Sequence, residues 1–407
     1  MSAMDIDQDL AAVLADLRET VDNADIAQVL YQLEDYYERK LWNQLAISLE
    51  ELYSIPESKQ GDLRAQIFTR FLAQFQNKLN PIKVVDLLLQ SFDEPSTCLQ
   101  KLGELEQLLV GELTKKLSSR RVENTESAIA DDEAIVYVRL QIARYALLMN
   151  DRSRAEEILE AASEKFDTTL QNEYSLKINA AFYLTKCQNY KIRENYNLFY
   201  TNGLLYLSSL DTPLFPEERL AFCHDLCIAA LLGDKIYNFG ELILHDILTT
   251  IAAPESEYFW LYNLIQTLNA GQLKKFTEWL KEAFTRSPQL AHHKQFLHEK
   301  IVIMSLLELI STKLSSDKKI LFAEICSITG TAADNVEFLI IKCFSLGLIK
   351  GFINQIEQVL VVTWLQPRIL NLDQVKTLYN HVVNWNQKVE KLTAEVRADG
   401  GTVWAGV

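Results

Sequence analysis

Residues 331–370 read TAADNVEFLIIKCFSLGLIKGFINQIEQVLVVTWLQPRIL, and this stretch decides the fold. In its first half, apolar residues recur every three or four positions, which predicts a helix with one buried face. Thr331 can act as the N-cap, with Asp334 at the third helical position, and Gly347 ends the helix. The buried side of this helix is predicted to carry Val336, Leu339, Ile340, Cys343, Phe344 and Leu346.

The second half of the same stretch predicts a β-hairpin. Two runs, Leu348–Ile353 and Val359–Trp364, are rich in β-branched and aromatic residues, and the five residues between them form a loop. Upstream, Ile320–Leu321 predict a short strand, and Ile325–Ser327 belong to a brief helix that ends in a turn. Helix, turn, helix and hairpin together are the layout of a winged-helix domain, which we place at residues 315–370.

A single helix with a heptad pattern is predicted after the hairpin, at residues 371–398, followed by a flexible tail at 399–407. Its apolar residues are spaced alternately by three and four positions, which is the seam of a helix that packs against other helices. The seam consists of Val375, Leu378, Val382, Trp385, Val389, Leu392 and Val396. Such a helix needs a partner, either its own domain or helices of other chains.

The long region before the winged helix, residues 28–314, predicts an α-solenoid of helix pairs. No proline lies between Pro95 and Pro213 and no glycine between Gly111 and Gly203, so neither helix breaker interrupts a long stretch. Short polar turns recur 39, 44 and 38 residues apart, which suits stacked helix pairs. These turns are placed at Asn150-Asp151, Asn189-Tyr190, Gly233-Asp234 and Gly271-Gln272.

Local signals refine this picture of a mainly α chain. Residues 29–53 carry one apolar helix stripe that is broken once into a pair, and Asn80-Pro81 marks a helix stop and restart. The polar residues 118–132 predict a loop. The first 27 residues are rich in Asp and Glu, and we interpret them as an acidic leader that ends in a short amphipathic helix.

Charge and composition disfavour several functions. The net charge is −15 and the pI about 5.0, whereas nucleic-acid or anionic-membrane binding needs a basic surface. The second helix of the winged-helix domain, Ala332–Leu346, has one basic residue, Lys342. We therefore expect the winged helix to pair with proteins through its sheet edge. Six scattered cysteines, no signal peptide and no run of 18 apolar residues predict a soluble intracellular protein.

No motif for catalysis or cofactor binding is recognisable in the sequence. Walker, dinucleotide-binding and nucleophile-elbow patterns are absent. His298-Glu299 does not continue to a second histidine, because position 302 is Val302. Cys223 and Cys227 lie one helical turn apart among apolar neighbours, so we predict core cysteines rather than metal ligands. We expect no enzyme activity, no catalytic residue, no cofactor and no metal.

Five blocks of the chain resemble the 26S proteasome non-ATPase regulatory subunit 13 family. They are ERKLWNQL (38–45), GDKIYNFGELIL (233–244), FSLGLIKG (344–351), VTWLQPRIL (362–370) and WNQKVEKL (385–392). The array of helical repeats with a non-basic winged helix is also similar to the PCI module, with the last helix pairs of the solenoid as its helical part. The resemblance implies a non-catalytic scaffold of the proteasome regulatory particle lid, acting in ubiquitin-dependent protein degradation in cytoplasm and nucleus.

The resemblance also implies partners and an interface. In that family, six winged helices pack side by side and the C-terminal helices form one bundle. The implied partners are other PCI subunits and the deubiquitinase pair of the lid, together with subunits of the base and the 20S core. The candidate interface residues are Trp364, Arg368, Leu378, Val382, Trp385, Val389 and Leu392. Trp364 and Trp385 are equally compatible with core positions, and Arg368 with a cap on the wing.

Two other functions remain open at the level of sequence. The chain can belong to a different PCI assembly, such as the signalosome or a translation-initiation complex. A winged-helix adaptor for nucleic acid is the third alternative, and it predicts binding that weakens steeply with salt.

Overall fold

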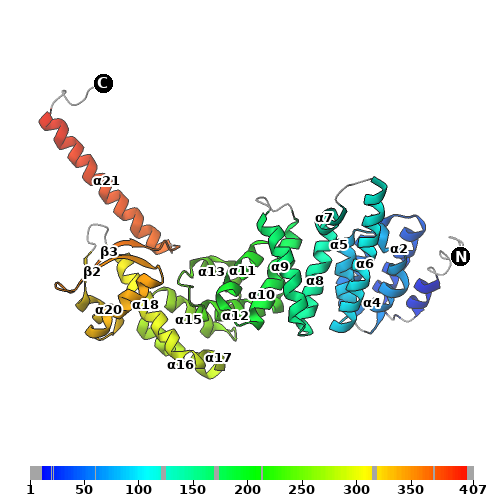
Figure 1. Cartoon of the computed structure of the whole chain (residues 1–407), viewed down its shortest axis with the longest axis horizontal. Coiled ribbons are helices and arrows are strands. Elements are labelled where there is room, and N and C mark those ends of the chain that lie inside the picture. Colours follow the sequence, from blue (N-terminus) through cyan, green and yellow to red (C-terminus); the bar gives the residue numbers. More distant parts are fainter. Residues whose placement is uncertain are drawn as a thin grey trace. The chain divides into compact units, whose positions relative to one another are not determined.

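The computed structural model describes residues 12–19, 21, 23–59, 61–120, 125–168, 174–211, 214–313, 319–369 and 372–400. The chain divides into two compact units, one of residues 1–194 with 201–212 and the other of residues 195–200 with 213–407. Helices dominate the described residues, and three strands form one small sheet. Figure 1 shows helical repeats followed by a winged helix and a final long helix. The predicted fold class is therefore confirmed.

The first unit is an array of antiparallel helices that stand side by side (Figure 1). A helix at residues 12–19 precedes α2 (Ala24–Glu38), α3 (Trp42–Ser54), η1 (Pro56–Lys59), α4 (Leu63–Gln66), η2 (Ile67–Phe71), η3 (Leu72–Gln74), η4 (Gln76–Lys78), α5 (Pro81–Ser91), α6 (Pro95–Arg120), α7 (Thr125–Ala130), α8 (Glu133–Leu148), α9 (Arg152–Thr168) and α10 (Leu176–Ile192). Helix α8 packs against α6, α9 and α10, which makes it the central helix of the unit.

The structure of the first unit confirms the local predictions made for the N-terminal helices. Lys40, in the left-handed conformation at φ 57°, separates α2 from α3 and breaks the predicted stripe into a pair. The Asn80 side chain accepts a hydrogen bond from the Ile82 amide at 3.0 Å and caps α5. In the helix at residues 12–19, Leu14 and Leu17 are buried in the core of the unit. Residues 1–11 of the predicted leader lie outside the described residues.

Two predicted breaks in the first unit are wrong. In the loop proposed for residues 118–132, most of the described residues are helical, because α6 continues to Arg120 and α7 covers Thr125–Ala130, while residues 121–124 lie outside the described residues. The turn proposed at Asn189 lies inside α10, and the chain turns at Glu194 with φ 55°. In both places polar side chains suggested a turn, but a polar side chain does not interrupt a helix as proline does, and Asn189 is buried within α10.

The second unit begins with further helices. They are α11 (Tyr196–Ser208), which both units share, and then α12 (Pro216–Leu232), α13 (Gly240–Leu244), η5 (Asp246–Leu248), α14 (Thr249–Ala252), α15 (Phe259–Asn269), α16 (Leu273–Arg286), α17 (Pro288–His292) and α18 (Lys294–Thr312). The three other predicted turns lie where the structure changes direction: Asn150 and Gly271 are left-handed, and Gly233 ends α12. Helix α18 packs against α12, α15 and α16 and is largely buried.

A buried lysine joins two helices of this unit. Lys300 of α18 is 1% exposed, and its Nζ donates to the carbonyls of Ala230, Leu231 and Gly233 at 2.8, 3.0 and 2.7 Å. These carbonyls lie at the C-terminal end of α12, where helical partners are missing. Burial lowers the pKa of Lys300 to about 7, and the charge of Asp234 opposes this shift.

The winged helix consists of β1 (Lys319–Leu321), α19 (Phe322–Thr329), α20 (Ala333–Ser345), β2 (Ile349–Asn354) and β3 (Val359–Leu365), and it is followed by α21 (Leu372–Gly400). The sheet is antiparallel with the order β1-β3-β2. All three predicted strands are confirmed to within one or two residues. Gly330 and Gly347 are left-handed and terminate α19 and α20, as expected for Gly347.

The predicted N-cap of the second helix is wrong by one residue. Helix α20 begins at Ala333 with Ala332 as its N-cap, and no side chain caps it. The Thr331 amide instead donates to the Thr329 hydroxyl at 3.4 Å. Thr331 is thus part of the turn between the two helices, where side-chain hydrogen bonds to the backbone are equally favourable.

Candidate interaction surfaces

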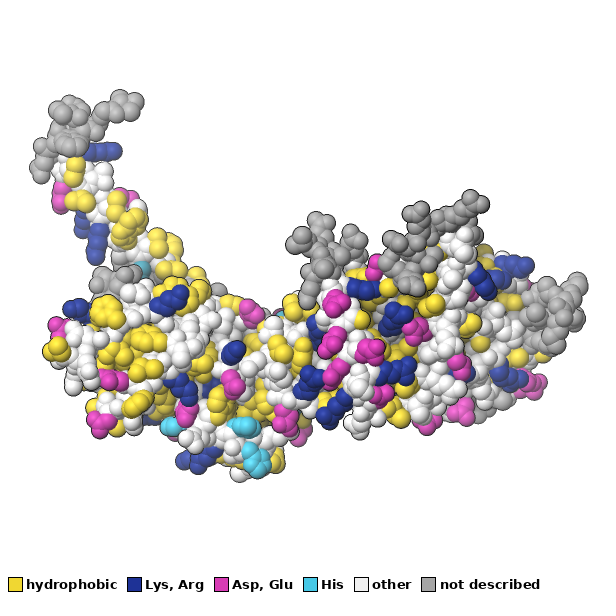
Figure 2. Space-filling view, in the orientation of Figure 1, with side chains coloured by type: hydrophobic (Ala, Val, Ile, Leu, Met, Phe, Trp, Pro, Cys, Tyr) yellow, Lys and Arg dark blue, Asp and Glu magenta, His cyan; other side chains and the backbone are white. Residues whose placement is uncertain are grey.

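Helix α21 exposes its entire heptad seam. Every seam side chain is solvent-accessible, from 38% for Val389 to 66% for Trp385, and Figure 2 shows apolar side chains along the helix. The predicted interface residues Leu378, Val382 and Leu392 lie on this stripe. Among the described residues, none of α21 is buried. The first option for this helix, packing back on its own domain, is therefore not realised in the single chain.

Trp364 lies on the outer face of the winged-helix sheet. It is 40% exposed, it pairs across the strands with Lys350, and the Lys350 ammonium lies 4.9 Å from the centre of its ring. Phe352 pairs with Val361 on the same face and is also exposed. Apolar side chains on the open face of a sheet are typical of surfaces that another protein covers.

The edge of the sheet is a second feature of this surface. In the described part of the chain, β2 pairs with β3 on one side only, so alternate residues of Ile349–Asn354 present unpaired backbone N–H and C=O groups at its other edge. Ile356 at the tip of the hairpin is 97% exposed. An unpaired edge with apolar side chains beside it favours pairing with another polypeptide.

Arg368 differs from the other candidates because its charge is paired with a carboxylate of the same chain. Its guanidinium lies 3.4 Å from the Glu308 carboxylate and donates to the Asn269 carbonyl at 3.1 Å. The side chain is 13% exposed. The cap on the wing considered from the sequence is not what this residue forms, since both partners belong to the preceding helices. We return to this contact below.

Sequence reasoning missed the exposed face of α20. Phe338 and Ile341, three positions apart on this helix, are 72% and 53% exposed. Lys342, the one basic residue of the helix, forms an ion pair with Glu299. The available signal was that these two large apolar residues fell outside the predicted buried side. This face is apolar rather than basic, which fits a protein partner better than a phosphate backbone.

Of the residues considered for chemistry, the two cysteines lie in the core, whereas His298 is exposed and Glu299 is half-buried. Cys223 and Cys227 are fully buried and free, as the core interpretation predicted. Burial raises the pKa of the Cys187 and Cys343 thiols to about 12, so neither is a ready nucleophile. Within the described ranges, no three His, Cys, Asp or Glu side chains are grouped as metal ligands. No helix there is long and apolar enough to cross a membrane.

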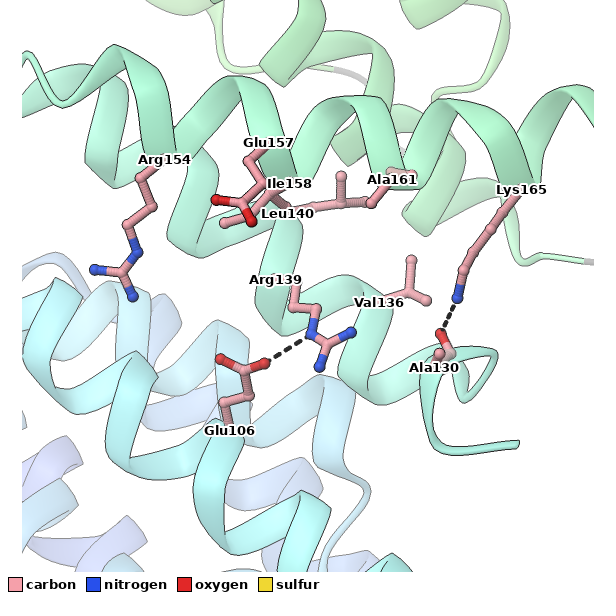
Figure 3. A pocket seen from close by; sticks show the side chains of 11 residues that line it. Glu106, Ala130, Val136, Arg139, Leu140, Arg154, Glu157, Ile158, Ala161 and Lys165 are labelled. Carbon is pink, nitrogen blue, oxygen red and sulfur yellow. Dashed lines mark hydrogen bonds and ion pairs between the residues drawn. The ribbon is translucent and has the colours of Figure 1, made fainter. Parts of the chain in front are cut away.

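The first unit contains a cavity of about 310 Å³ between α6, α8 and α9 (Figure 3). Its floor is apolar, and charged side chains surround it. Arg139 donates to Glu106 at 2.7 Å and Lys165 to the Ala130 carbonyl at 2.6 Å. These two cations are paired, and no nucleophile with an adjacent base lines the cavity. The cavity is therefore compatible with a structural hollow between helix pairs.

Repeated helix pairs that end in a winged helix define the PCI class, and comparison with known families places the chain there. Residues 270–364 match the PCI domain model, and residues 29–265 match the model of PSD13 N-terminal repeats. The chain is 35% identical to the 26S proteasome regulatory subunit RPN9 of Saccharomyces cerevisiae, over 97% of this chain and 98% of the relative.

Other relatives extend the similarity to a plant and a second yeast. The 26S proteasome non-ATPase regulatory subunit 13 homolog B of Arabidopsis thaliana is 31% identical, over 90% of this chain and 92% of its own length. A probable 26S proteasome regulatory subunit rpn9 of Schizosaccharomyces pombe is 32% identical over 91% and 92%. The chain belongs to the 26S proteasome non-ATPase regulatory subunit 13 family.

Proposed function

We propose that this chain is a non-catalytic scaffold subunit of the 26S proteasome regulatory particle lid. The observation that carries the proposal is the exposed seam of α21, which a single chain leaves open over three heptads. Burying a Leu or Val side chain stabilises an assembly by about 1.5–3 kcal/mol. Six such side chains and Trp385 on one helix strongly favour association with other helices, consistent with relatives that are named as proteasome regulatory subunits.

We assign a separate role in assembly to each of the two exposed surfaces, the seam of α21 and the sheet of the winged helix. Residues 371–398 act as a bundle helix, and residues 315–370 contact neighbouring winged helices through the open sheet face and the β2 edge. The partners are other PCI subunits and the deubiquitinase pair of the lid, with base and 20S core subunits further away. The chain acts in cytoplasm and nucleus and contributes no catalytic group.

The seam can be tested by charge substitution. A chain with Leu378→Asp and Leu392→Asp places two carboxylates in the seam, where burial without a partner is costly. A matched control carries Asn380→Asp and Gln387→Glu, which add the same charge on the opposite face of α21. Both pairs are expected to leave the folded units intact by circular dichroism. On native gels, the seam variant loses incorporation into the lid, whereas the control incorporates normally.

Affinity purification separates the proposal from its alternatives. Proteasomal ATPase-ring and 20S subunits that co-purify with the tagged chain support the lid assignment. Recovery of another PCI assembly without them contradicts it. Salt-dependent nucleic-acid binding by the purified chain points to the adaptor instead. Equal incorporation of the seam variant and the control shows that α21 is not the bundle helix.

A further inference from the structure

The segment between the wing and α21 contacts the helical part of the second unit. The Gln366 amide still donates to the Leu348 carbonyl at 2.8 Å, so the chain leaves the sheet there. Arg368 and Ile369 follow shortly after, and both make tertiary contacts. Helix α21 starts three residues later, at Leu372. The contacts of these two residues therefore lie at the base of the exposed helix.

Arg368 forms polar contacts with two helices, α18 and α15. Glu308, its ionic partner, belongs to α18, and Asn269, whose carbonyl accepts its second hydrogen bond, is the last residue of α15. A carbonyl at a helix C-terminus lacks a helical partner, and a cation there is favoured by the helix dipole. The ion pair is largely shielded, with Glu308 25% exposed, so solvent screens it less than a surface pair.

Ile369 fits against a glycine that cannot be enlarged. A Cβ added to Gly240 would lie 2.5 Å from the Ile369 Cβ, far closer than van der Waals contact allows. Gly240 begins α13 and is itself buried. Residues 233–239 connect α12 to α13. Lys300 donates a hydrogen bond to the carbonyl of Gly233, the first residue of this connection. Helices α13, α15 and α18 thus all contribute to holding two consecutive residues.

We propose that Arg368 and Ile369 form a clamp that positions the base of α21 on helices α13, α15 and α18. Incorporation into the assembly then depends on Glu308 and Gly240, although Gly240 is buried and Glu308 is largely shielded. Arg368 is a positioning residue that acts within the chain, while the seam of α21 meets the partners. The inference rests on the proposed function only for its assembly readout.

A double-mutant cycle on the isolated full chain tests the clamp. Glu308→Ala is expected to accelerate hydrogen exchange of the peptide that begins at Gln366 by about tenfold, because local opening becomes easier. In the Arg368→Ala background, the same change is expected to alter exchange by less than about twofold, since its partner is gone. Glu308→Gln repeats the test with a side chain of the same shape. Equal acceleration in both backgrounds, or none in either, overturns the clamp.

Two glycine substitutions test the steric contact between Gly240 and Ile369. Gly240→Ala is expected to displace Ile369 and to raise exchange of the same peptide, whereas Gly103→Ala, in α6 with no atom within 4 Å, leaves it unchanged. Arg286→Ala, which removes a surface pair with Glu282 and a hydrogen bond to the Glu257 carbonyl, controls for loss of one charge. Unchanged exchange in Gly240→Ala contradicts the contact.

The assembly readout separates the clamp from the lid assignment. Variants with faster exchange are expected to incorporate at least about threefold less well than the Gly103→Ala and Arg286→Ala controls. If the natural chain itself fails to enter the lid, the proposed function is wrong, while the exchange cycle still decides the clamp. Normal incorporation of clamp variants whose exchange has risen shows that the clamp does not position α21 for assembly.

Discussion

Helices α18 and α21 belong to the same unit and both carry apolar stripes, yet their surroundings are opposite. Helix α18 buries eleven of its 19 residues, including Leu297 and Ile301 with no exposed surface, and even its Lys300 is enclosed. Helix α21 has 29 residues and buries none that the structure describes. The stripe of α18 finds its partners in its own chain, whereas the stripe of α21 remains open.

This difference shows that amphipathic periodicity identifies a helix and its apolar face. It does not show whether the same chain or another chain supplies the complementary face. Substitutions in the two helices are therefore expected to affect different measurements. Changes in α18 act on the stability of the free chain, and changes in α21 act on assembly. The predictions below test that separation, from the largest expected effect to the smallest.

Ile301→Ala should have the largest effect on the isolated chain. The side chain is fully buried in α18, and truncation of such a residue costs about 2–5 kcal/mol because a cavity remains. Urea unfolding monitored by circular dichroism measures this loss in the second unit. A cost below about 0.5 kcal/mol, the size expected at a surface position, contradicts the packing of α18 described here.

Lys300→Met should destabilise the same unit by about 2 kcal/mol at pH 7.5, because three carbonyls at the end of α12 lose their donor. Methionine has a similar length, so the change removes the hydrogen-bonding nitrogen with little change in volume. Lys294→Met, at the exposed start of α18, is the matched control and should change stability by less than about 0.5 kcal/mol. Equal unfolding midpoints for the two variants refute the prediction.

The pH dependence of that difference is also predicted. Burial lowers the pKa of Lys300 to about 7, well below its value in the unfolded chain. Between pH 7 and 10 the unfolded state therefore binds more protons at this site, and stability from this group rises with pH. The nearby Tyr237, whose pKa burial raises to about 12, does not titrate in that range. The cost of Lys300→Met should consequently increase from pH 7 to pH 9, and a constant or shrinking cost argues against a lowered pKa of Lys300 in the folded chain.

Leu378→Ala should have the smallest effect on the free chain. The side chain is 51% exposed on α21, so its truncation is expected to change the free energy of unfolding by less than about 0.5 kcal/mol. The same substitution should weaken incorporation into the lid, as measured on native gels. A large loss of stability in the free chain would mean that α21 has a partner within its own chain, and the comparison with α18 would fail.

Much of the fold followed from local pattern. The heptad spacing from Val375 to Val396 lies within α21, the Asn80-Pro81 signal begins α5, and the runs that start at Leu348 and Val359 are strands. These features depend on neighbours in sequence, which periodicity and breaker residues report directly. The two wrong breaks, at Asn189 and at residues 118–132, arose where polar residues continue a helix.

The candidate surface was only partly predictable. The seam of α21 was identified by spacing alone, but Arg368 was grouped with it although its partners Glu308 and Asn269 lie 60 and 99 residues away. Phe338 was not recognised as exposed, because a helix pattern shows which residues share a face and not which face is covered. Such pairings depend on tertiary packing, which single-sequence periodicity does not contain.

The sequence by itself determined the helical class, the winged-helix layout and the heptad seam, since hydrophobic period and turn residues act over a few positions. Only the tertiary structure decided that Ile301 is enclosed while Leu378 is open, and that Lys300 meets the end of α12. The physical reason is that burial and buried charge depend on which distant surfaces meet, and residues such as Gly233 and Lys300 come together only when the helices stack.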